Sequence, residues 1–299
     1  MFGKNAFYAV GLMVLMGCST QNGNTQLFAK NTKLEKASTN YTFTEGPAVD
    51  KEGNVYFTDQ PNDKIYKWDW TTNQVSLFSD NTGRANGTYF NSKDELITCS
   101  DNLGEMWKFN KKGEKLETLI TDFNGKRLNG PNDLWIDSKD GIYFTDPLYV
   151  REYWTNFKQE IPQKNLYFRN TDGKIQVLDQ FTQPNGIIGS NTLKKLYVSD
   201  IDANKTYVYD IVGEGKLANK KLFCELGSDG MTLDNKGNLY LTGKGVFVYN
   251  PQGVQILHIP IDEEEWTSNV TFGGKNRDIL FVTTTTSVYT IKMNVKAIN

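Results

Sequence analysis

The stretch Tyr56-Phe57-Thr58-Asp59 decides the fold, because it returns along the chain at regular intervals. It recurs unchanged as Tyr143-Phe144-Thr145-Asp146. Looser versions of it occupy residues 98–101, 197–200, 240–243 and 280–283. Each copy is a run of aromatic and β-branched residues, which favours a β-strand, and no long stretch of the chain has the periodicity of a helix.

Turns and further strands surround these repeats. Turns rich in glycine and polar residues precede several of them, as at residues 50–54 and 138–141, and such residues tolerate the positive φ angles of hairpins. Most copies are followed by another strand-like segment, as at residues 64–68 and 246–249. Short strands that repeat about every 40 to 50 residues are typical of propeller blades. We therefore predict an all-β fold, a six-bladed β-propeller over residues 38–299.

The composition restricts the function. The chain has 299 residues with 38% hydrophobic and 13% aromatic side chains, enough for a sizeable core. Its formal net charge of -2, with dispersed charges, gives no reason to expect a nucleic-acid partner.

The single histidine, His258, excludes a histidine-rich zinc site and is expected on an outer strand. We expect Cys99 and Cys224 to be unpaired core thiols, although an exported protein could join them.

The N-terminal residues 1–18 have the pattern of an export signal. Lys4 provides a positive charge, and residues 6–16 are apolar but too few to span a membrane as a helix. They end in Leu15-Met16-Gly17-Cys18, which resembles a bacterial lipobox with Cys18 as the lipidated residue; an ordinary signal peptide is the alternative. Residues 19–37 are polar and predict a flexible tether. We expect an exported lipoprotein, periplasmic or on the outer membrane, that meets the membrane only through this anchor.

A side chain with a carboxylate or amide oxygen lies eleven or twelve residues before each repeat. The six are Glu45, Asn86, Asn132, Asn185, Asp229 and Asn269, at spacings of 41, 46, 53, 44 and 40 residues. The first strand of a propeller blade lies innermost, so these side chains should face the central channel at one end. Carboxylate and amide oxygens are the ligands that hard divalent cations prefer. The sequence therefore predicts a metal site on the axis.

A structural explanation of these six residues is also available. Glycine follows four of them, and Asn-Gly and Asp-Gly are common turn dipeptides. Turn chemistry does not easily explain Glu45 before Gly46-Pro47, nor Asn132 within Gly130-Pro131-Asn132-Asp133. We therefore favour the metal site over the purely structural explanation.

Seven motifs in order give the chain a family resemblance. They are Phe43-Thr44-Glu45-Gly46-Pro47, Ala85-Asn86-Gly87, Arg127-Leu128-Asn129-Gly130-Pro131-Asn132-Asp133-Leu134, Tyr143-Phe144-Thr145-Asp146-Pro147, Gln183-Pro184-Asn185-Gly186, Asp229-Gly230-Met231 and Asn269-Val270-Thr271-Phe272-Gly273-Gly274. With them the chain resembles the gluconolactonase/senescence-marker-protein (regucalcin) family of six-bladed propeller lactonases, especially its bacterial gluconolactonase-like branch. The motifs extend over essentially the whole predicted propeller.

The resemblance implies a hydrolase that opens a sugar lactone to the aldonic acid at one divalent cation. The ion is usually Ca²⁺, with Zn²⁺, Mn²⁺ or Mg²⁺ as other options. The residues that match the family's metal ligands are Glu45, Asn132, Asn185 and Asp229. Asp229 is also our candidate general base, and Asn86 and Asn269 would then contact the substrate or hold water. The protein is expected to act as a monomer on a small sugar lactone.

The chain departs from the family where substrate is contacted. Animal members carry an arginine at the position of Gly130, and Arg127 is the nearest basic replacement unless it is merely a solvated charge. We include Arg127 and Asn129 among the predicted substrate-binding residues. Many bacterial members have a Glu-His pair where this chain has Ser100-Asp101-Asn102. Hydrolysis of other lactones, aryl esters or phosphotriesters is therefore an alternative, and a non-enzymatic ligand-binding propeller is a second one.

Two loops have ambiguous roles. The acidic residues 262–265 are expected to form a solvated loop between the fifth and sixth blades, although they could line the edge of the pocket. Tyr149, Tyr153 and Trp154 lie in the longest insertion between repeats. This insertion could form a lid or a sugar-stacking wall over the pocket, or a small satellite core.

Overall fold

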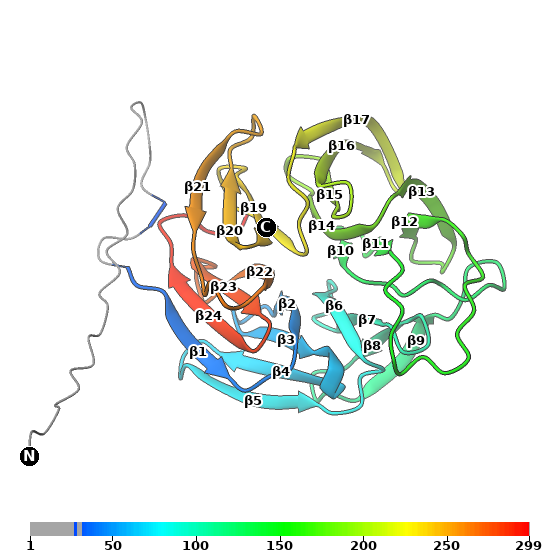
Figure 1. Ribbon diagram of the computed structural model, residues 1–299, viewed down its shortest axis with the longest axis horizontal. Helices are drawn as coiled ribbons and strands as arrows, with labels where there is room; N and C mark the ends of the chain where they lie inside the picture. The colour runs from blue at the N-terminus through cyan, green and yellow to red at the C-terminus, as the bar shows by residue number, and fades with distance from the viewer. Residues whose placement is uncertain (1–26, 29–31, 299) are drawn as a thin grey trace, which may run out of the picture.

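Six four-stranded antiparallel sheets form a closed ring around a central channel (Figure 1). The computed structural model describes residues 27–28 and 32–298. Within these residues the only helix is a single 3₁₀ turn, η1 (Gln60–Asn62). None of the described segments is a helix of the length and hydrophobicity needed to cross a bilayer. The six-bladed β-propeller predicted from the sequence is confirmed.

Each blade is a meander that runs outward from the axis. Blade 1 contains β2 (Thr44–Val49), β3 (Val55–Asp59), β4 (Lys64–Asp69) and β5 (Gln74–Ser79); blade 2 contains β6 (Ala85–Phe90), β7 (Leu96–Ser100), β8 (Glu105–Phe109) and β9 (Lys115–Ile120). Blade 3 contains β10 (Leu134–Ile136), β11 (Ile142–Asp146), β12 (Lys164–Arg169) and β13 (Ile175–Phe181); blade 4 contains β14 (Pro184–Ser190), β15 (Lys195–Asp200), β16 (Lys205–Gly213) and β17 (Lys216–Cys224). Blade 5 contains β18 (Met231–Leu233), β19 (Leu239–Gly243), β20 (Gly245–Tyr249) and β21 (Gln255–Ile259); blade 6 contains β22 (Thr267–Gly273), β23 (Ile279–Thr284), β24 (Ser287–Lys292) and β1 (Glu35–Thr39).

Blade 6 closes the ring with strands from both ends of the propeller. The outermost strand, β1, pairs antiparallel with β24, from Glu35 opposite Thr290 to Thr39 opposite Ser287. Closure in this way joins the N-terminal strand to the C-terminal blade, and the sheet edges that a propeller leaves open are short and protected. The sequence predicted a tether up to residue 37, but the structure places residues 35–37 in β1, inside the propeller. The predicted signal and Cys18 lie outside the described residues.

The threonine of the repeated motif joins neighbouring blades. Thr58 Oγ1 donates a hydrogen bond to the carbonyl oxygen of Asn86 (3.0 Å), and Thr145 Oγ1 donates to that of Asn185 (2.8 Å). The second strand of one blade therefore fixes the backbone of the oxygen-bearing residue in the next blade. The repeat thus helps to position the six predicted oxygen-bearing residues around the axis, here called the axial ring, as well as to form the strands.

The aspartate of the motif holds the loop that leads into the inner strand. Asp146 accepts hydrogen bonds from the backbone N–H groups of Asn129 (3.1 Å) and Gly130 (2.8 Å). For the looser repeats at residues 98–101 and 280–283, the predicted alignment with the motif is wrong by one residue. In blade 1, Asp59 pairs with Thr44. The equivalent residue is Ser100, opposite Ala85, in blade 2 and Thr284, opposite Thr267, in blade 6.

The hydrophobic core lies between adjacent blades. Tyr143 of blade 3, for example, is fully buried in a cluster that includes Leu196 of blade 4. Cys99 and Cys224 are buried, unpaired thiols, as expected, and burial raises the pKa of Cys224 to about 11. His258 lies on the outer strand β21, where its ring stacks on Phe247 at 4.2 Å, so its role is structural.

Candidate active site

The structure brings the six predicted axial residues to one end of the channel. Glu45, Asn86, Asn185 and Asn269 lie in the inner strands β2, β6, β14 and β22, whereas Asn132 and Asp229 lie two residues before the start of β10 and β18. Five of the six are buried, and Asp229 is partly exposed. Near these residues, each of the inner strands β2, β6, β14 and β22 shifts its pairing register against the second strand of its blade. Such shifts mark β-bulges. Bulges next to a site commonly direct side chains out of the regular pleat.

The glycines that follow four of these residues allow the inner strands to approach closely. A Cβ atom on Gly46 would lie 2.1 Å from the carbonyl oxygen of Asn86. A Cβ atom on Gly230 would lie 1.9 Å from Cγ of Asn269. Any larger residue would push neighbouring blades apart. These glycines therefore serve close packing around the axis, and hairpin turns do not explain them.

The carboxylate of Asp229 is held on both of its oxygens. Asn185 Nδ2 donates to Asp229 Oδ1 and Trp266 Nε1 donates to Asp229 Oδ2, each at 2.8 Å. Asn185 Nδ2 also lies 3.1 Å from the hydroxyl of Tyr149. Asn185 Oδ1 is buried, and no described residue donates a hydrogen bond to it. A buried amide oxygen without a donor is costly unless a ligand or water satisfies it.

The opposite half of the ring centres on Glu45. Asn269 Nδ2 donates to Glu45 Oε2 at 3.0 Å, and the backbone N–H of Gly46 donates to the same oxygen at 2.8 Å. Asn269 Oδ1 accepts from the N–H of Val270 (2.8 Å), so both ends of this amide are engaged. Asn269 therefore orients Glu45. Asn86 Oδ1, like that of Asn185, is buried without a donor among the described residues.

Negative charge accumulates at this end of the channel. Burial raises the pKa of Glu45 well above its ordinary range, and the nearby charge of Asp229 raises it further. Burial raises the pKa of Asp229 to about 6, against the hydrogen bonds from Trp266 and Asn185. Burial also raises the pKa of Asp133 to about 7. Carboxylates that are destabilised in this way are relieved by a bound cation.

The donor set fits a hard divalent cation. The described residues contain no group of three His, Cys, Asp or Glu side chains that could hold a metal, so any site here must also use amides. Glu45 and Asp229 would provide carboxylate oxygens, and Asn132 and Asn185 would provide amide oxygens. Such mixed oxygen ligands suit Ca²⁺, which accepts six to eight oxygens in a flexible geometry. Asn185 Oδ1, which has no donor among the described residues, is free to bind such an ion.

Two predicted substrate-binding residues have other contacts. Arg127 Nη1 donates to the carbonyl oxygens of Leu128 (2.8 Å) and Asn129 (3.3 Å), and its guanidinium lies over the ring of Trp154. Asn129 is 1% exposed, and its Nδ2 donates to the carbonyl oxygen of Gln163 (2.8 Å). Both residues therefore fix the long loop between β11 and β12 (residues 147–163). The polar atoms of both residues bond within the protein, and their role in binding substrate stays a prediction.

The long loop 147–163 combines the two roles left open for it. Tyr149 reaches the axial ring through Asn185, as a wall of the pocket would. Trp154, 9% exposed, packs against Phe157 at 4.8 Å and belongs to a satellite core.

Asp101 anchors this loop, a role that no motif in the sequence indicates. The hydroxyl of Tyr153 donates to Asp101 Oδ1 (2.6 Å), and Arg151 Nε donates to Oδ2 (3.1 Å). Gln60 of η1 also donates to Oδ2, at 2.8 Å. The partners are 41 to 52 residues away in sequence, so no local pattern could have paired them.

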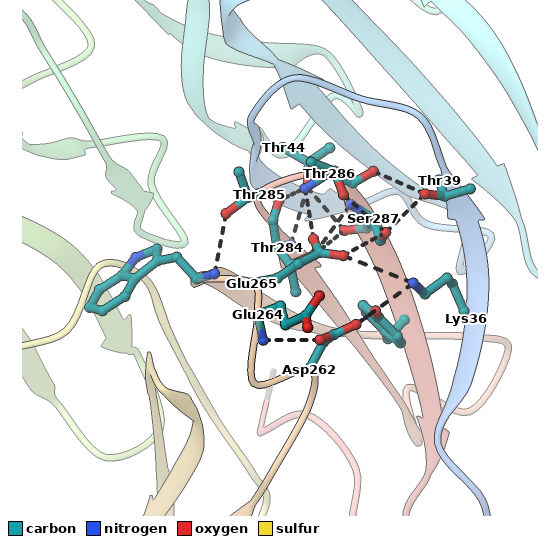
Figure 2. Close-up of polar contacts among 12 residues, drawn as sticks. Lys36, Thr39, Thr44, Asp262, Glu264, Glu265, Thr284, Thr285, Thr286 and Ser287 are labelled. Atoms are coloured by element: carbon teal, nitrogen blue, oxygen red, sulfur yellow. Dashed lines mark hydrogen bonds and ion pairs between the residues drawn. The ribbon is translucent and has the colours of Figure 1, made fainter. Parts of the chain in front are cut away.

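The acidic segment 262–265 is not a simple solvated loop (Figure 2). Glu265 accepts hydrogen bonds from the backbone N–H of Thr286 (2.7 Å) and from Ser287 Oγ (2.9 Å). Lys36 of β1 lies 3.9 Å from Glu265 Oε1. The expectation of a solvated loop is therefore wrong for Glu265, which ties the loop to the strands that close the ring. The next residue, Trp266, is the one that reaches Asp229.

With this geometry, the sequence comparisons identify the family. The profile of the SMP-30/Gluconolactonase/LRE-like region matches residues 43–286. The chain belongs to this family. The gluconolactonase of Zymomonas mobilis is 25% identical over 295 residues, which cover 88% of this chain and 82% of that protein. The diisopropyl-fluorophosphatase of Loligo vulgaris is 26% identical over 241 residues, 71% of this chain and 76% of that one.

The fold of this family member is shared with solved structures. A Xanthomonas campestris protein described as a gluconolactonase superposes with a TM-score of 0.82 at 24% identity. The alignment covers 90% of this chain and 91% of that protein. The propeller fold of this chain is therefore shared with that protein.

Proposed function

We propose that this protein hydrolyses a sugar lactone to the aldonic acid, with Ca²⁺ bound by Glu45, Asn132, Asn185 and Asp229. The observation that carries the proposal is the cluster of oxygen side chains at one end of the channel, where desolvation raises the pKa of both Glu45 and Asp229. The Zymomonas mobilis relative, named a gluconolactonase, supports the choice of substrate class.

The chain's own residues would provide general-base catalysis and positioning. A bound cation would supply positive charge beside the lactone carbonyl oxygen, where negative charge develops during attack by water. Asp229 would accept the proton of that water, since it is a carboxylate fixed by two donors. Asn185 and Trp266 would hold its orientation through the reaction. Glu45, held by Asn269, would remain a ligand without a part in proton transfer.

Hydrolysis of phosphotriesters or aryl esters is the second candidate. The relationship to the diisopropyl-fluorophosphatase of Loligo vulgaris favours it, and the same axial residues would serve. A propeller that only binds a ligand on its surface is less well supported, because it has no use for buried carboxylates at the axis.

One assay separates these candidates. Acid release is measured from glucono-δ-lactone, xylonolactone and a phenyl ester, with chelator and after Ca²⁺ is restored. The proposal expects lactone hydrolysis that chelator abolishes and Ca²⁺ restores. Activity that is insensitive to chelator, or no activity on any of the three with metal bound, would contradict it. Parallel restoration with Zn²⁺, Mn²⁺ and Mg²⁺ identifies the preferred ion.

We also propose that the protein is exported and anchored by a lipid on Cys18. The lipobox-like sequence before Cys18 supports this location. We expect the propeller to act as a monomer at the membrane surface.

A further inference from the structure

Arg151 lies at the mouth of the candidate site, on the loop 147–163. Its guanidinium lies over the ring of Tyr149, 5.5 Å from the centroid, and the Tyr149 hydroxyl contacts Asn185 of the axial ring. Tyr149 is therefore the side chain that links Arg151 to Asn185 of the axial ring.

Asp101 fixes Arg151 but uses only one of its three nitrogens. Arg151 Nε donates to Asp101 Oδ2 at 3.1 Å, while Tyr153 and Gln60 hold the same carboxylate. In the part of the chain that the structure describes, no group accepts a hydrogen bond from Nη1 or Nη2 of Arg151. The side chain of Arg151 is 28% exposed, so these two nitrogens are accessible to a ligand.

The neighbouring arginines are already engaged. Arg127 donates to backbone carbonyls, and Arg84 donates to the carbonyl of Pro61 with its guanidinium over the Tyr153 ring. At Gly130, where φ is +149°, a Cβ atom would lie 3.0 Å from the indole of Trp154, so any side chain there is disfavoured. Of these arginines, Arg151 is the one whose Nη1 and Nη2 both have no acceptor among the described residues.

We propose that Arg151 is a specificity-determining residue that selects lactones bearing oxygen substituents, by donating hydrogen bonds from Nη1 and Nη2. The proposal rests on the lactone hydrolysis proposed above. The planar guanidinium donates two parallel hydrogen bonds, which match a pair of adjacent hydroxyls or a carboxylate. Asp101 acts as a positioning residue, because it holds the guanidinium in a fixed direction. An unsubstituted aliphatic lactone offers no such pair of acceptors.

The test compares two lactones on the Ca²⁺-loaded protein and its variant Arg151→Gln. For glucono-δ-lactone, the variant should raise KM about 10- to 100-fold, the range for a lost charged hydrogen bond, with a smaller change in kcat. For δ-valerolactone, kcat/KM should change by no more than about threefold. Lys158→Gln, which removes an exposed cation from the same loop, should leave both reactions unchanged. Equal losses on both lactones, or no loss on either, would overturn the proposal.

Tyr153→Phe distinguishes recognition from loop anchoring. It removes the other hydrogen bond from the loop to Asp101 and leaves the guanidinium in place. If Arg151 only anchors the loop, both variants should lose activity on both lactones alike, and that result would also overturn the proposal. We expect the selective rise in KM with Arg151→Gln alone.

A binding measurement keeps this test separate from turnover. Calorimetry with gluconate and Ca²⁺ should show binding that Arg151→Gln weakens by about tenfold or more. Equal affinities in the two proteins would overturn the role of Arg151. A wild-type protein that hydrolyses neither lactone would contradict the proposed function, while the gluconate measurement would still decide the role of Arg151.

Discussion

Trp266 donates its indole N–H to Oδ2 of Asp229 at 2.8 Å, so a loop residue between blades 5 and 6 orients a carboxylate at the axis. The preceding residue, Glu265, ties the same loop to the start of β24. Ring closure and the geometry of the candidate base are therefore linked through two adjacent residues. Trp266 is 40% exposed, so substrate can reach it as well.

Replacement of Trp266 by phenylalanine should impair turnover more than binding. The change keeps an aromatic ring but removes the donor to Asp229 Oδ2, which lets the carboxylate rotate. We expect kcat on a lactone to fall by about tenfold, the effect of one hydrogen bond to a charged group. Trp70→Phe is the matched control, because its indole donates to the carbonyl of Glu52 on blade 1. Steady-state kinetics with equal effects in both variants would contradict a role for Trp266.

Asp229→Asn tests the assignment of the general base. The amide keeps an oxygen for the metal but cannot accept the proton of the attacking water. We expect kcat to fall by about 10²- to 10⁴-fold, the usual contribution of a positioned base, with partial retention of Ca²⁺. Kinetics and metal content are measured together, with the exposed Asp202→Asn as control. Undiminished turnover would refute the assignment.

The axial ring was predictable because it follows from the repeat. Each blade places the same position of its inner strand at the channel, so counting from the strands located Glu45, Asn86 and their four equivalents. The repeat also carries the bonds that set this level, such as Thr58 to the carbonyl of Asn86. Around Ser100 and Thr284, where the motif is less well preserved, the predicted alignment of the strand was wrong by one residue. In blade 2 the aspartate, Asp101, comes one residue after the end of β7, and the copy in blade 6 has no aspartate.

The pocket wall could not be predicted in the same way. Arg127 looked like a substrate-binding cation, but the carbonyls of Leu128 and Asn129 take its donors, and backbone direction is invisible in a sequence. Tyr149 and Trp266 reach the ring from loops of unequal length, which no repeat positions. Local sequence therefore located the ring but not the side chains that surround it.

Glu45→Gln tests two roles of Glu45: a buried charge that destabilises the metal-free protein, and a ligand of the metal. Burial and the charge of Asp229 raise the pKa of Glu45, so its ionised form destabilises the metal-free protein. The variant should melt at the same or a higher temperature than wild type in chelator. Wild type should gain about 2.7 kcal/mol of stability with Ca²⁺ at a hundred times its Kd, and the variant should gain less. An equal Ca²⁺-dependent shift in both proteins would contradict Glu45 as a ligand.

Cys18→Ala should release the protein from the membrane. If Cys18 carries the lipid, its loss leaves the exported chain without an anchor. Fractionation of cells should move the variant from the membrane to the soluble periplasmic fraction, with its lactonase activity retained. Substitution of Cys99, a buried core thiol, is the control and should leave the location unchanged. A variant that stays in the membrane fraction would contradict the lipid anchor.

Glu265 should make ring closure dependent on pH. Burial opposes its ionisation, but hydrogen bonds from Thr284, Thr286 and Ser287 outweigh that and hold the pKa of Glu265 below its ordinary value. A depressed folded-state pKa contributes stability that is present above the unfolded value of about 4.3 and is lost as the pH falls through the folded value. Glu265→Gln should therefore cost about 2 kcal/mol at pH 7 in urea unfolding.

That cost should shrink at low pH, because protonated Glu265 and glutamine are both uncharged and accept weaker hydrogen bonds. Measurement at pH 7 and again at about pH 3 tests this, since the wild-type carboxylate is then largely protonated. Glu264→Gln is the matched control, because Glu264 is exposed on the same loop and its substitution should cost little at either pH. A difference between wild type and Glu265→Gln that stayed constant across this range would show that packing, and not the ionised carboxylate, makes the contact stabilising.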